Sequence, residues 1–223
     1  MITFVSSSSQ YLTSVSTFSP FIPGTVCFWV YPTLVTLSRY VFQADPSFLV
    51  RLSPGTATIA KISAILYRNS TTTTSNILTV NTLNHVAITW ETSGSNTLIN
   101  IYINAVLDIS EAKTSNIPAS GTLYIGQTGS SGNYLDAYLE DLRFYNRVLL
   151  LGEVESIYYS RGNDEIDYGL LNRWPMAEET YDGNTITGTG VIKDYINPGL
   201  HLTPAASPVY SSSFLKLRRK GNV

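Results

Sequence analysis

Apolar and polar residues alternate with a period of two along most of the chain, which is the pattern of β-strands. The alternation is clearest in TVCFWVY (25–31), HVAITWE (85–91) and LINIYINA (98–105). In the first of these, Val26, Phe28 and Val30 would face one side of a strand. The intervening Cys27 and Trp29 are apolar as well, so we predict a central strand covered on both faces. Shorter runs predict further strands at 2–5, 10–15, 39–43, 47–52, 57–66, 122–126, 134–145, 170–175 and 200–204.

Turn-forming stretches separate these predicted strands, among them SPFIPG, ADPS, ETSGSN, QTGSSGN and INPG. One segment has helical periodicity: in GEVESIYYSR (152–161), Val154, Ile157 and Tyr158 recur at helical spacing and form one stripe. The segment RNSTTTTSN (68–76) is of low complexity and predicts a loop. Many short strands with one short helix indicate an all-β fold, an antiparallel two-sheet jelly-roll sandwich.

Charge is scarce and unevenly placed. Charged residues make up 13% of the 223 residues, about half of the ~25% usual in soluble domains. Four of the 14 basic residues lie in the last ten positions, namely Lys216, Arg218, Arg219 and Lys220. The first 213 residues therefore carry the other 10 basic residues and all 16 acidic ones. A basic tail on an acidic body indicates an acidic partner; the alternative is a solvated, disordered terminus.

Cysteine and histidine are too few for a disulfide or a zinc site. Cys27 is the single cysteine, and His85 and His201 are the two histidines. We expect Cys27 to be a small buried apolar residue. The first residues lack the basic and apolar regions of a secretion signal, and no apolar run reaches the ~18 residues of a membrane span. We therefore expect synthesis in the host cytoplasm and no membrane partner.

Glu140 and Asp141 are adjacent carboxylates close to Arg143, a combination that raises the question of a hydrolase or a metal site. Glycoside hydrolysis needs two carboxylates that face each other across the sugar, about 5–9 Å apart. Neighbouring side chains of a strand point to opposite faces, so we predict that Glu140 and Asp141 are separated, unless a β-bulge reverses the alternation. We expect a structural ion pair between Asp141 and Arg143, or with a neighbouring strand.

The sequence carries no other catalytic signature. It has no G-x-S-x-G elbow and no P-loop, and Lys193 in GTGVIK takes the place of the third glycine of a dinucleotide fingerprint. His85 stands at the head of an amphipathic strand, where we expect a hydrogen-bonded structural residue. The body is acidic and its tyrosines are not grouped with basic residues, which opposes contact with phosphates. We predict that the protein is not an enzyme and does not bind nucleic acid.

Three segments, GTVCFWVYPT (24–33), LNHVAITWETSGSNTLINIYINAVL (83–107) and GTLYIG to ESIYY (121–159), resemble laminin-G-like, concanavalin A-like jelly rolls. The third is the most specific, because a strand, an Asn-Arg turn and a short amphipathic helix follow in a fixed order. The resemblance covers about residues 1–160. It implies a two-sheet sandwich of a family whose members mostly bind sugars, proteins or copies of themselves.

The segment 168–210 resembles a part that comes first in many family members but comes last here. A second copy of the fold would have only about 50 residues and no partner sheet, which is too little for its own core. We predict one domain over residues 1–213, in which 168–213 completes the sandwich by packing back on the N-terminal strands. The basic tail, 214–223, follows.

One departure from the family pattern concerns calcium. Many members bind calcium with an aspartate in an N-terminal loop, but Val5 and Ser6 stand where Asp and Gly would be. Asp136, Glu140 and Asp141 remain near the second part of that site, without the carboxylate partner that calcium prefers. We therefore predict no cofactor, with calcium as the alternative.

Two further departures affect local structure. Ala105 occupies a hairpin position where a type I′ turn prefers glycine, so we expect a different turn. Leu149, Leu150 and Leu151 stand where the family has a serine helix cap, which loses roughly 1 kcal/mol of capping. One sheet face cannot bury all three leucines: either two of them lie under the helix, or they contact another subunit.

Two functional hypotheses follow. The first is a bacteriophage virion protein, either a capsid decoration protein or a fibre or tail subunit, that docks on other virion proteins or on copies of itself. The low charge, the missing secretion signal and the short basic tail motivate it, because such permuted chains resemble phage structural proteins. Its predicted partner-binding residues are Leu149, Leu150, Leu151, Lys216, Arg218, Arg219 and Lys220.

The alternative is a carbohydrate-binding module used for adsorption to host-surface glycans. Sugars stack on exposed aromatic rings, while polar side chains hold the hydroxyl groups. The candidates for stacking are Tyr134, Tyr138, Tyr158, Tyr159 and Trp174, most of which we expect to find in the core.

Overall fold

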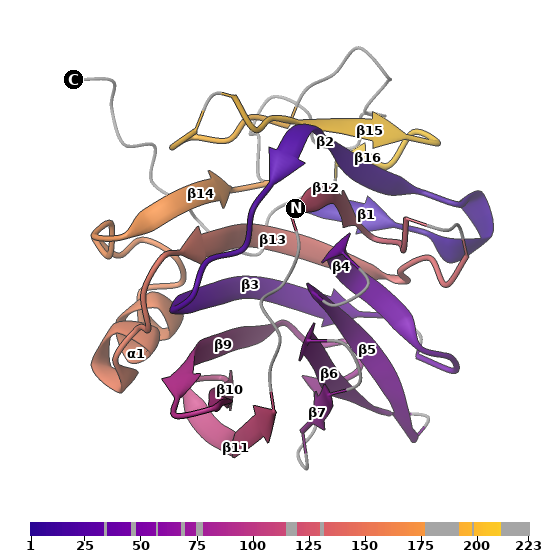
Figure 1. Ribbon diagram of the computed structural model, residues 1–223. Coiled ribbons are helices and arrows are strands. Elements are labelled where there is room, and N and C mark those ends of the chain that lie inside the picture. Colours follow the sequence, from indigo (N-terminus) through magenta and orange to yellow (C-terminus); the bar gives the residue numbers. More distant parts are fainter. Residues whose placement is uncertain are drawn as a thin grey trace.

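The computed structural model describes residues 1–33, 35–45, 48–56, 58–67, 70–74, 78–114, 120–129, 132–176, 192–197 and 199–210. Within these residues the strands form two antiparallel sheets of eight strands each, with one short α-helix. The two sheets, A and B, enclose the main core between them (Figure 1).

Sheet A contains β1 (Ile2–Phe4), β3 (Gly24–Pro32), β9 (Asn84–Ser93), β10 (Asn96–Ile103), β11 (Val106–Thr114), β13 (Ala137–Tyr145), β14 (Leu170–Trp174) and β16 (Val209–Tyr210). Its order is β11-β10-β9-β3-β13-β1-β16, with β14 also paired to β13. A 3₁₀ turn, η1 (Ser6–Ser8), follows β1.

Sheet B contains β2 (Tyr11–Phe18), β4 (Arg39–Asp45), β5 (Phe48–Thr56), β6 (Ile59–Tyr67), β7 (Ser70–Thr73), β8 (Leu78–Thr79), β12 (Gly121–Ile125) and β15 (Leu202–Ala205). Its order is β15-β2-β12-β4-β5-β6-β7, with β8 also paired to β6.

The period-two alternation produces the core between the sheets. Val26, Phe28 and Val30 of β3 point inward, as do Val50 and Leu52 of β5, and all five are fully buried. Burial of each such side chain stabilises the fold by roughly 1.5–3 kcal/mol. The opposite face of β3 is buried as well, so the prediction of a central strand covered on both faces is confirmed.

The C-terminal strands pair with N-terminal ones. Ile2 of β1 pairs with Tyr210 of β16, and Leu12 of β2 pairs with Pro204 of β15. The predicted fold class, a two-sheet sandwich with one short helix and C-terminal strands packed back on N-terminal ones, is confirmed. The domain limits 1–213 and 214–223 stay a prediction, because residues 211–223 lie outside the described part of the chain.

Four strands escaped the sequence analysis, two of them the two-residue strands β8 and β16. β11 was not predicted, and β7 forms within the segment 68–76 that was predicted to be a loop. Both strands lie at sheet edges. β11 buries no residue, so it shows no apolar alternation. β7 is rich in threonine, whose branched side chain favours strands without being apolar.

The hairpin between β10 and β11 has a type I′ turn, although a different turn was expected there. Asn104 and Ala105 have φ angles of 51° and 65°, and Ile103 pairs with Val106, which is type I′ geometry. The predicted departure from this turn is therefore wrong. Asn104 tolerates the left-handed region well, and its side chain accepts the His85 backbone N–H at 2.8 Å, which anchors the turn.

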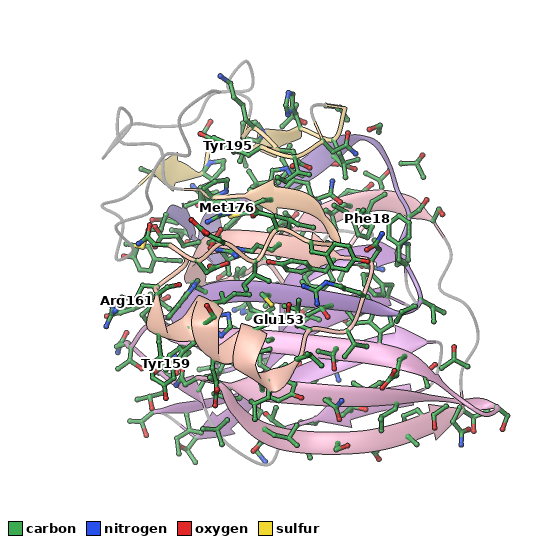
Figure 2. The ribbon with its side chains drawn as sticks, turned by 90° about the vertical axis from the view of Figure 1, so that its left-hand side faces the viewer. Phe18, Glu153, Tyr159, Arg161, Met176 and Tyr195 are labelled. Carbon is green, nitrogen blue, oxygen red and sulfur yellow. The ribbon has the colours of Figure 1, made fainter. Side chains whose placement is uncertain are left out.

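The helix α1 (Leu151–Tyr159) lies on the outward face of sheet A. Val154 and Ile157 pack with Cys27, Ala87 and Tyr102 in a second apolar cluster. Figure 2 looks onto this side, with Glu153 near one end of the helix and Tyr159 and Arg161 near the other. Figure 1 shows α1 on the side of β3 and β9, away from β5, β6 and β7.

Candidate functional site

A β-bulge in β13 changes the picture of the two adjacent acids. Between Glu140 and Arg143 the register with β3 shifts by one residue, and Asp141 has a φ of 50°. Leu139 and Leu142 both face the main core as a result. Glu140 and Asp141 therefore share the outward face of sheet A. The prediction that alternation separates them is wrong, because the β-bulge that was named as its exception is present.

The shared face does not make the two acids catalytic, because both are almost fully buried, at 1% exposure each. Glu140 lies 3.8 Å from the amino group of Met1. Asp141 is bound to Arg143 and, on β14, to Arg173. A general acid or base has to reach its substrate, and these two carboxylates are engaged within the protein instead.

Arg143 is the centre of a buried ionic cluster. It donates to Asp141 Oδ2 from Nε at 3.0 Å and from Nη2 at 2.6 Å, and to Asp164 Oδ1 from Nη1 at 2.9 Å. It also donates to the Gly162 carbonyl at 3.0 Å and to the Tyr145 hydroxyl at 3.3 Å. The predicted pairing of Asp141 with Arg143 and with a neighbouring strand is confirmed.

The charges of the cluster hold two segments of the chain together. Burial tends to raise the pKa of Asp164, but hydrogen bonds and the charge of Arg143 outweigh it, so this pKa lies below its usual range. Burial alone would lower the pKa of Arg143, yet Asp141 holds it well above its ordinary value. Both groups stay ionised and tie the segment 160–169 to β13.

An aromatic group lies beside this cluster. The ring of Trp29 stacks on Tyr158 of α1 with centroids 5.7 Å apart, and His85 lies 4.9 Å from Trp29. Both ring nitrogens of His85 are buried without a hydrogen-bond partner. The prediction of a hydrogen-bonded histidine is therefore wrong for the ring, which packs as an aromatic group. Burial lowers the pKa of His85 to about 3, so the ring is neutral.

Cys27 is free and buried, as predicted. Burial raises the pKa of its thiol, so the group is protonated. His201 accepts the backbone N–H of Asp194 at its Nδ1.

The three leucines divide at the start of α1. Leu149 is 1% exposed and belongs to the second apolar cluster, whereas Leu150 and Leu151 are 70% and 48% exposed. Leu149 is thus a core residue and not a contact for a partner, because the helix and sheet A already cover it. The expectation that two of the leucines lie under the helix is wrong, because Leu149 alone does so. Leu150 and Leu151 stay predicted contacts.

The serine cap that is missing from the sequence is partly replaced. Glu153 accepts the Leu150 backbone N–H at 2.8 Å and binds both terminal nitrogens of Arg147, at 2.6 and 2.7 Å. The hydrogen bond with Arg147 lowers the pKa of Glu153, which keeps a negative charge at the positive end of the helix.

The remaining predicted contacts cannot be placed. Lys216, Arg218, Arg219 and Lys220 lie outside the described residues. Among the aromatic candidates, Trp174 is fully buried in the main core, Tyr134, Tyr138 and Tyr158 are half-buried, and Tyr159 is 76% exposed.

The residues do not fit the calcium site of the family. Asp136 Oδ1 accepts the Ser6 backbone N–H at 2.7 Å, so the N-terminal loop does reach this carboxylate, as the resemblance implies. Its Oδ2 faces the guanidinium of Arg39 at 3.4 Å, which repels a cation. Throughout the described residues, no three His, Cys, Asp or Glu side chains are grouped to hold a metal ion.

The outward face of sheet B differs from that of sheet A. Its residues include Tyr11, Thr13, Tyr40, Gln43, Arg51, Ser53, Lys61, Ser63, Thr73, Thr122 and Tyr124, which we call the open face. Most of them are half-buried or exposed, and the helix lies on the other sheet. The corresponding outward side of sheet A, under α1 and the segment 160–169, is called the covered face.

Three tyrosines gather at the β12 end of the open face. The ring of Tyr11 lies 6.4 Å from that of Tyr124 and 6.4 Å from that of Tyr134, which comes from the loop after β12. Gln43 pairs with Tyr124 across the strands, and its side-chain oxygen accepts the Gly129 N–H at 3.2 Å. Half-buried rings beside amide and hydroxyl groups suit a ligand with apolar ring faces and polar edges.

Further along the open face, polar groups replace the rings. The hydroxyl of Ser63 lies within hydrogen-bond distance of Ser53, at 2.8 Å, and of Thr73, at 2.9 Å. Arg51 pairs across the strands with Ser63 on one side and with Tyr40 on the other. Ser63 is almost fully buried, so a hydroxyl-rich or anionic group can reach Ser53, Thr73 and the guanidinium of Arg51.

The sequence analysis included Tyr134 among its candidates but missed Tyr11 and Tyr124. The signal was present, since Tyr11 and Thr13 alternate with buried Leu12, as Thr122 and Tyr124 alternate with Leu123. What the sequence does not show is that β2 and β12 are neighbours, which brings the two tyrosines together.

Within the described part of the chain, no helix is long and apolar enough to cross a membrane.

Comparisons with solved structures agree with the fold. A protein from Bacteroides ovatus ATCC 8483, provisionally described as a carbohydrate-binding protein, is 14% identical and has a TM-score of 0.69. The match covers 97% of this chain and 61% of that one. A heptameric pentraxin from Limulus polyphemus is 19% identical, with a TM-score of 0.59, over 72% of this chain and 82% of that one.

At the level of sequence, a search of the curated proteins found no significant match. A family model does match residues 5–155, which is well over half of the chain and contains the first two segments that resemble laminin-G-like jelly rolls and most of the third. The chain belongs to the concanavalin A-like lectin/glucanases superfamily.

Proposed function

We propose that the chain is a non-catalytic carbohydrate-binding domain whose saccharide lies on the open face. The observation that carries this is the group of Tyr11, Tyr124 and Tyr134 beside Gln43. Sugar rings have apolar faces that pack on aromatic rings, and their hydroxyls need hydrogen-bonding side chains at the edge.

The ion pairs of Glu140 and Asp141 support a binding role rather than catalysis. Glu140 and Asp141 are the adjacent carboxylates of the chain's most family-like segment, and both are held in buried ion pairs. The relationship to a lectin-like superfamily and the likeness to the Bacteroides protein are consistent with a binding role. Fold alone does not decide function, so the open face has to be tested.

The test is a glycan array probed with the wild-type chain, followed by titration of the saccharides that bind. Tyr124→Ala should weaken binding at least tenfold, because it removes a ring at the centre of the site, a loss of about 1.4 kcal/mol or more. The matched control is Tyr159→Ala, on α1, which should bind like the wild type.

An array without any bound saccharide would overturn the proposal. So would equal losses in the two variants, because Tyr159 belongs to α1, which packs on the covered face, and not to the open face.

A second role is favoured by Leu150 and Leu151, which leave two large apolar side chains exposed at the start of α1. We propose it as a subunit contact, in line with the hypothesis that the chain is part of a bacteriophage particle. Exposed apolar residues are a usual feature of protein interfaces.

The subunit role is tested by mass spectrometry of phage particles purified from cells that carry the gene. Detection of the chain in the particles supports the role. Release of the chain by the double substitution Leu150→Ser and Leu151→Ser, but not by Tyr11→Ser, would assign the contact to α1. Purified particles without the chain would argue against it.

A further inference from the structure

Charge is distributed unequally between the two sheets. Among the strands of sheet B, Asp45 is the one acidic residue, against Arg39, Arg51 and Lys61. The strands and helix of sheet A carry most of the acidic residues found in regular structure, as in β11, β13 and α1. Because residues 1–213 have six more acidic than basic residues, a sheet with an excess of basic residues stands out.

Arg51 lies on β5, an interior strand of sheet B, and on the open face. It lies between Leu49 and Ser53, which point outward with it, while Val50 and Leu52 point into the core. The side chain is half-buried, and its Nε is buried without a hydrogen-bond partner. The arginines of the covered face, Arg143 and Arg173, are in contrast bound to carboxylates.

The residues facing Arg51 are neutral. Its cross-strand neighbours are Tyr40 on β4 and Ser63 on β6, and Ser63 leads on to Thr73. Lys61, which pairs with Ser53, adds a second positive charge to the same face. A half-buried guanidinium with no acid among its described cross-strand neighbours is suited to a carboxylate or sulfate of a ligand.

We infer that the saccharide bound by the open face is acidic, and that Arg51 binds its carboxylate or sulfate group. This inference rests on the proposed carbohydrate-binding function and specifies its ligand. Tyr124 and Arg51 lie two strands and two residues apart in the sheet, which corresponds to roughly 10–12 Å. A short oligosaccharide can therefore stack on Tyr124 while its acidic group reaches Arg51.

The experiment uses pairs of saccharides that differ in one acidic group per unit. The probes are an oligogalacturonate with its carboxyl-reduced neutral counterpart, and sialyllactose with lactose. Affinities are measured by calorimetry at low and at high salt with the full chain. The wild type should bind the acidic member of a pair at least tenfold more tightly, and salt should reduce this preference.

Substitutions then show which residue causes the preference for the acidic saccharide. Arg51→Gln should reduce it to within threefold while leaving binding of the neutral member unchanged. Arg51→Lys keeps the charge but loses the forked donors, so part of the preference should remain. Arg161→Gln, which removes an exposed arginine after α1, is the matched control and should behave like the wild type.

Equal binding of acidic and neutral members, abolished by Tyr124→Ala, would overturn the inference and leave the carbohydrate-binding function intact. Binding of none of these saccharides or of any array glycan would remove that function and the inference with it. Inorganic polyphosphate bound as tightly as the acidic sugars, or a preference lowered equally by Arg161→Gln, would identify a general attraction for anions and overturn the inference.

Discussion

The covered face of sheet A and the open face of sheet B both carry arginine and tyrosine, but the two faces use them in opposite ways. On the covered face, Arg143 is fully bound by Asp141, Asp164 and the Gly162 carbonyl. On the open face, Arg51 has an Nε without any partner and neutral neighbours. The same residue type is therefore bound to carboxylates on one face and has no acid among its described cross-strand neighbours on the other.

The role of a charged residue follows from its partners rather than from its position in a motif. Glu140 and Asp141 attract attention in the sequence, yet both are used inside the protein. The open face has no catalytic motif, but most of its side chains are half-buried or exposed. Substitutions on the two faces should therefore affect different properties, stability on one and binding on the other.

The largest expected effect is from Arg143→Met. Removal of the guanidinium leaves Asp141 and Asp164 buried with less compensation, which typically costs 3–5 kcal/mol of folding free energy. Chemical denaturation measures the loss. The control Arg51→Met should change stability by less than about 0.5 kcal/mol, as expected of a surface substitution. Similar losses in both variants would contradict the division between the faces.

The second-largest effect on stability is expected from Leu149→Ala. The side chain fills the second apolar cluster under α1, and truncation of a buried leucine costs roughly 2–5 kcal/mol. Leu151→Ala, two positions on and half exposed, should stay within about 0.5 kcal/mol of the wild type in the same denaturation experiment. If the order of the two losses were reversed, the assignment of Leu149 to the core would be wrong.

The pH dependence of stability should reveal the lowered pKa of His85. Burial first, and the charge of Arg143 second, lower the pKa of His85 from 6.5 to about 3 in the folded chain. Below pH 6.5 the unfolded chain therefore binds a proton that the folded chain does not, and stability falls as the pH drops toward 3.

Between pH 7 and pH 5 this amounts to roughly 2 kcal/mol. Asp164 titrates outside this interval, because its pKa is lowered below the ordinary value and its contribution is lost only at more acidic pH. Denaturation curves at several pH values measure the slope. His85→Leu should flatten it, and an unchanged slope in that variant would show that other groups cause it.

The smallest effect is expected from a matched pair of tyrosines. The Tyr145 hydroxyl donates to the Ile166 carbonyl at 3.0 Å and accepts from Arg143, so Tyr145→Phe should cost about 1–2 kcal/mol. Tyr124→Phe on the open face should leave stability unchanged within ~0.5 kcal/mol. Equal changes in thermal unfolding of the two variants would count against the difference in pairing.

Much of the fold could be predicted from sequence because alternation is a local signal. The strands around Val26 and Ile88, with their buried and outward faces, follow directly from it. The bulge at Asp141 was allowed for as an exception but not predicted, since one additional residue in a strand leaves the apolar pattern on each side intact and only changes its phase. A residue type that tolerates the left-handed region, such as aspartate, was the sole local hint.

The candidate site was less predictable because it depends on pairing between distant strands. Asp141 and Arg173 are 32 residues apart in sequence and meet because β14 returns beside β13. Tyr11 and Tyr124 meet because β2 and β12 are neighbours. Such contacts are set by topology, which a single sequence does not specify.

The location of the ligand on the open face is tested most directly by hydrogen–deuterium exchange with and without a saturating saccharide from the array. The expected result is slower exchange in peptides from β2, β12, β4 and β5, with no change in peptides that cover α1. Protection confined to α1, or an equal change on both sides of the sandwich, would contradict the account.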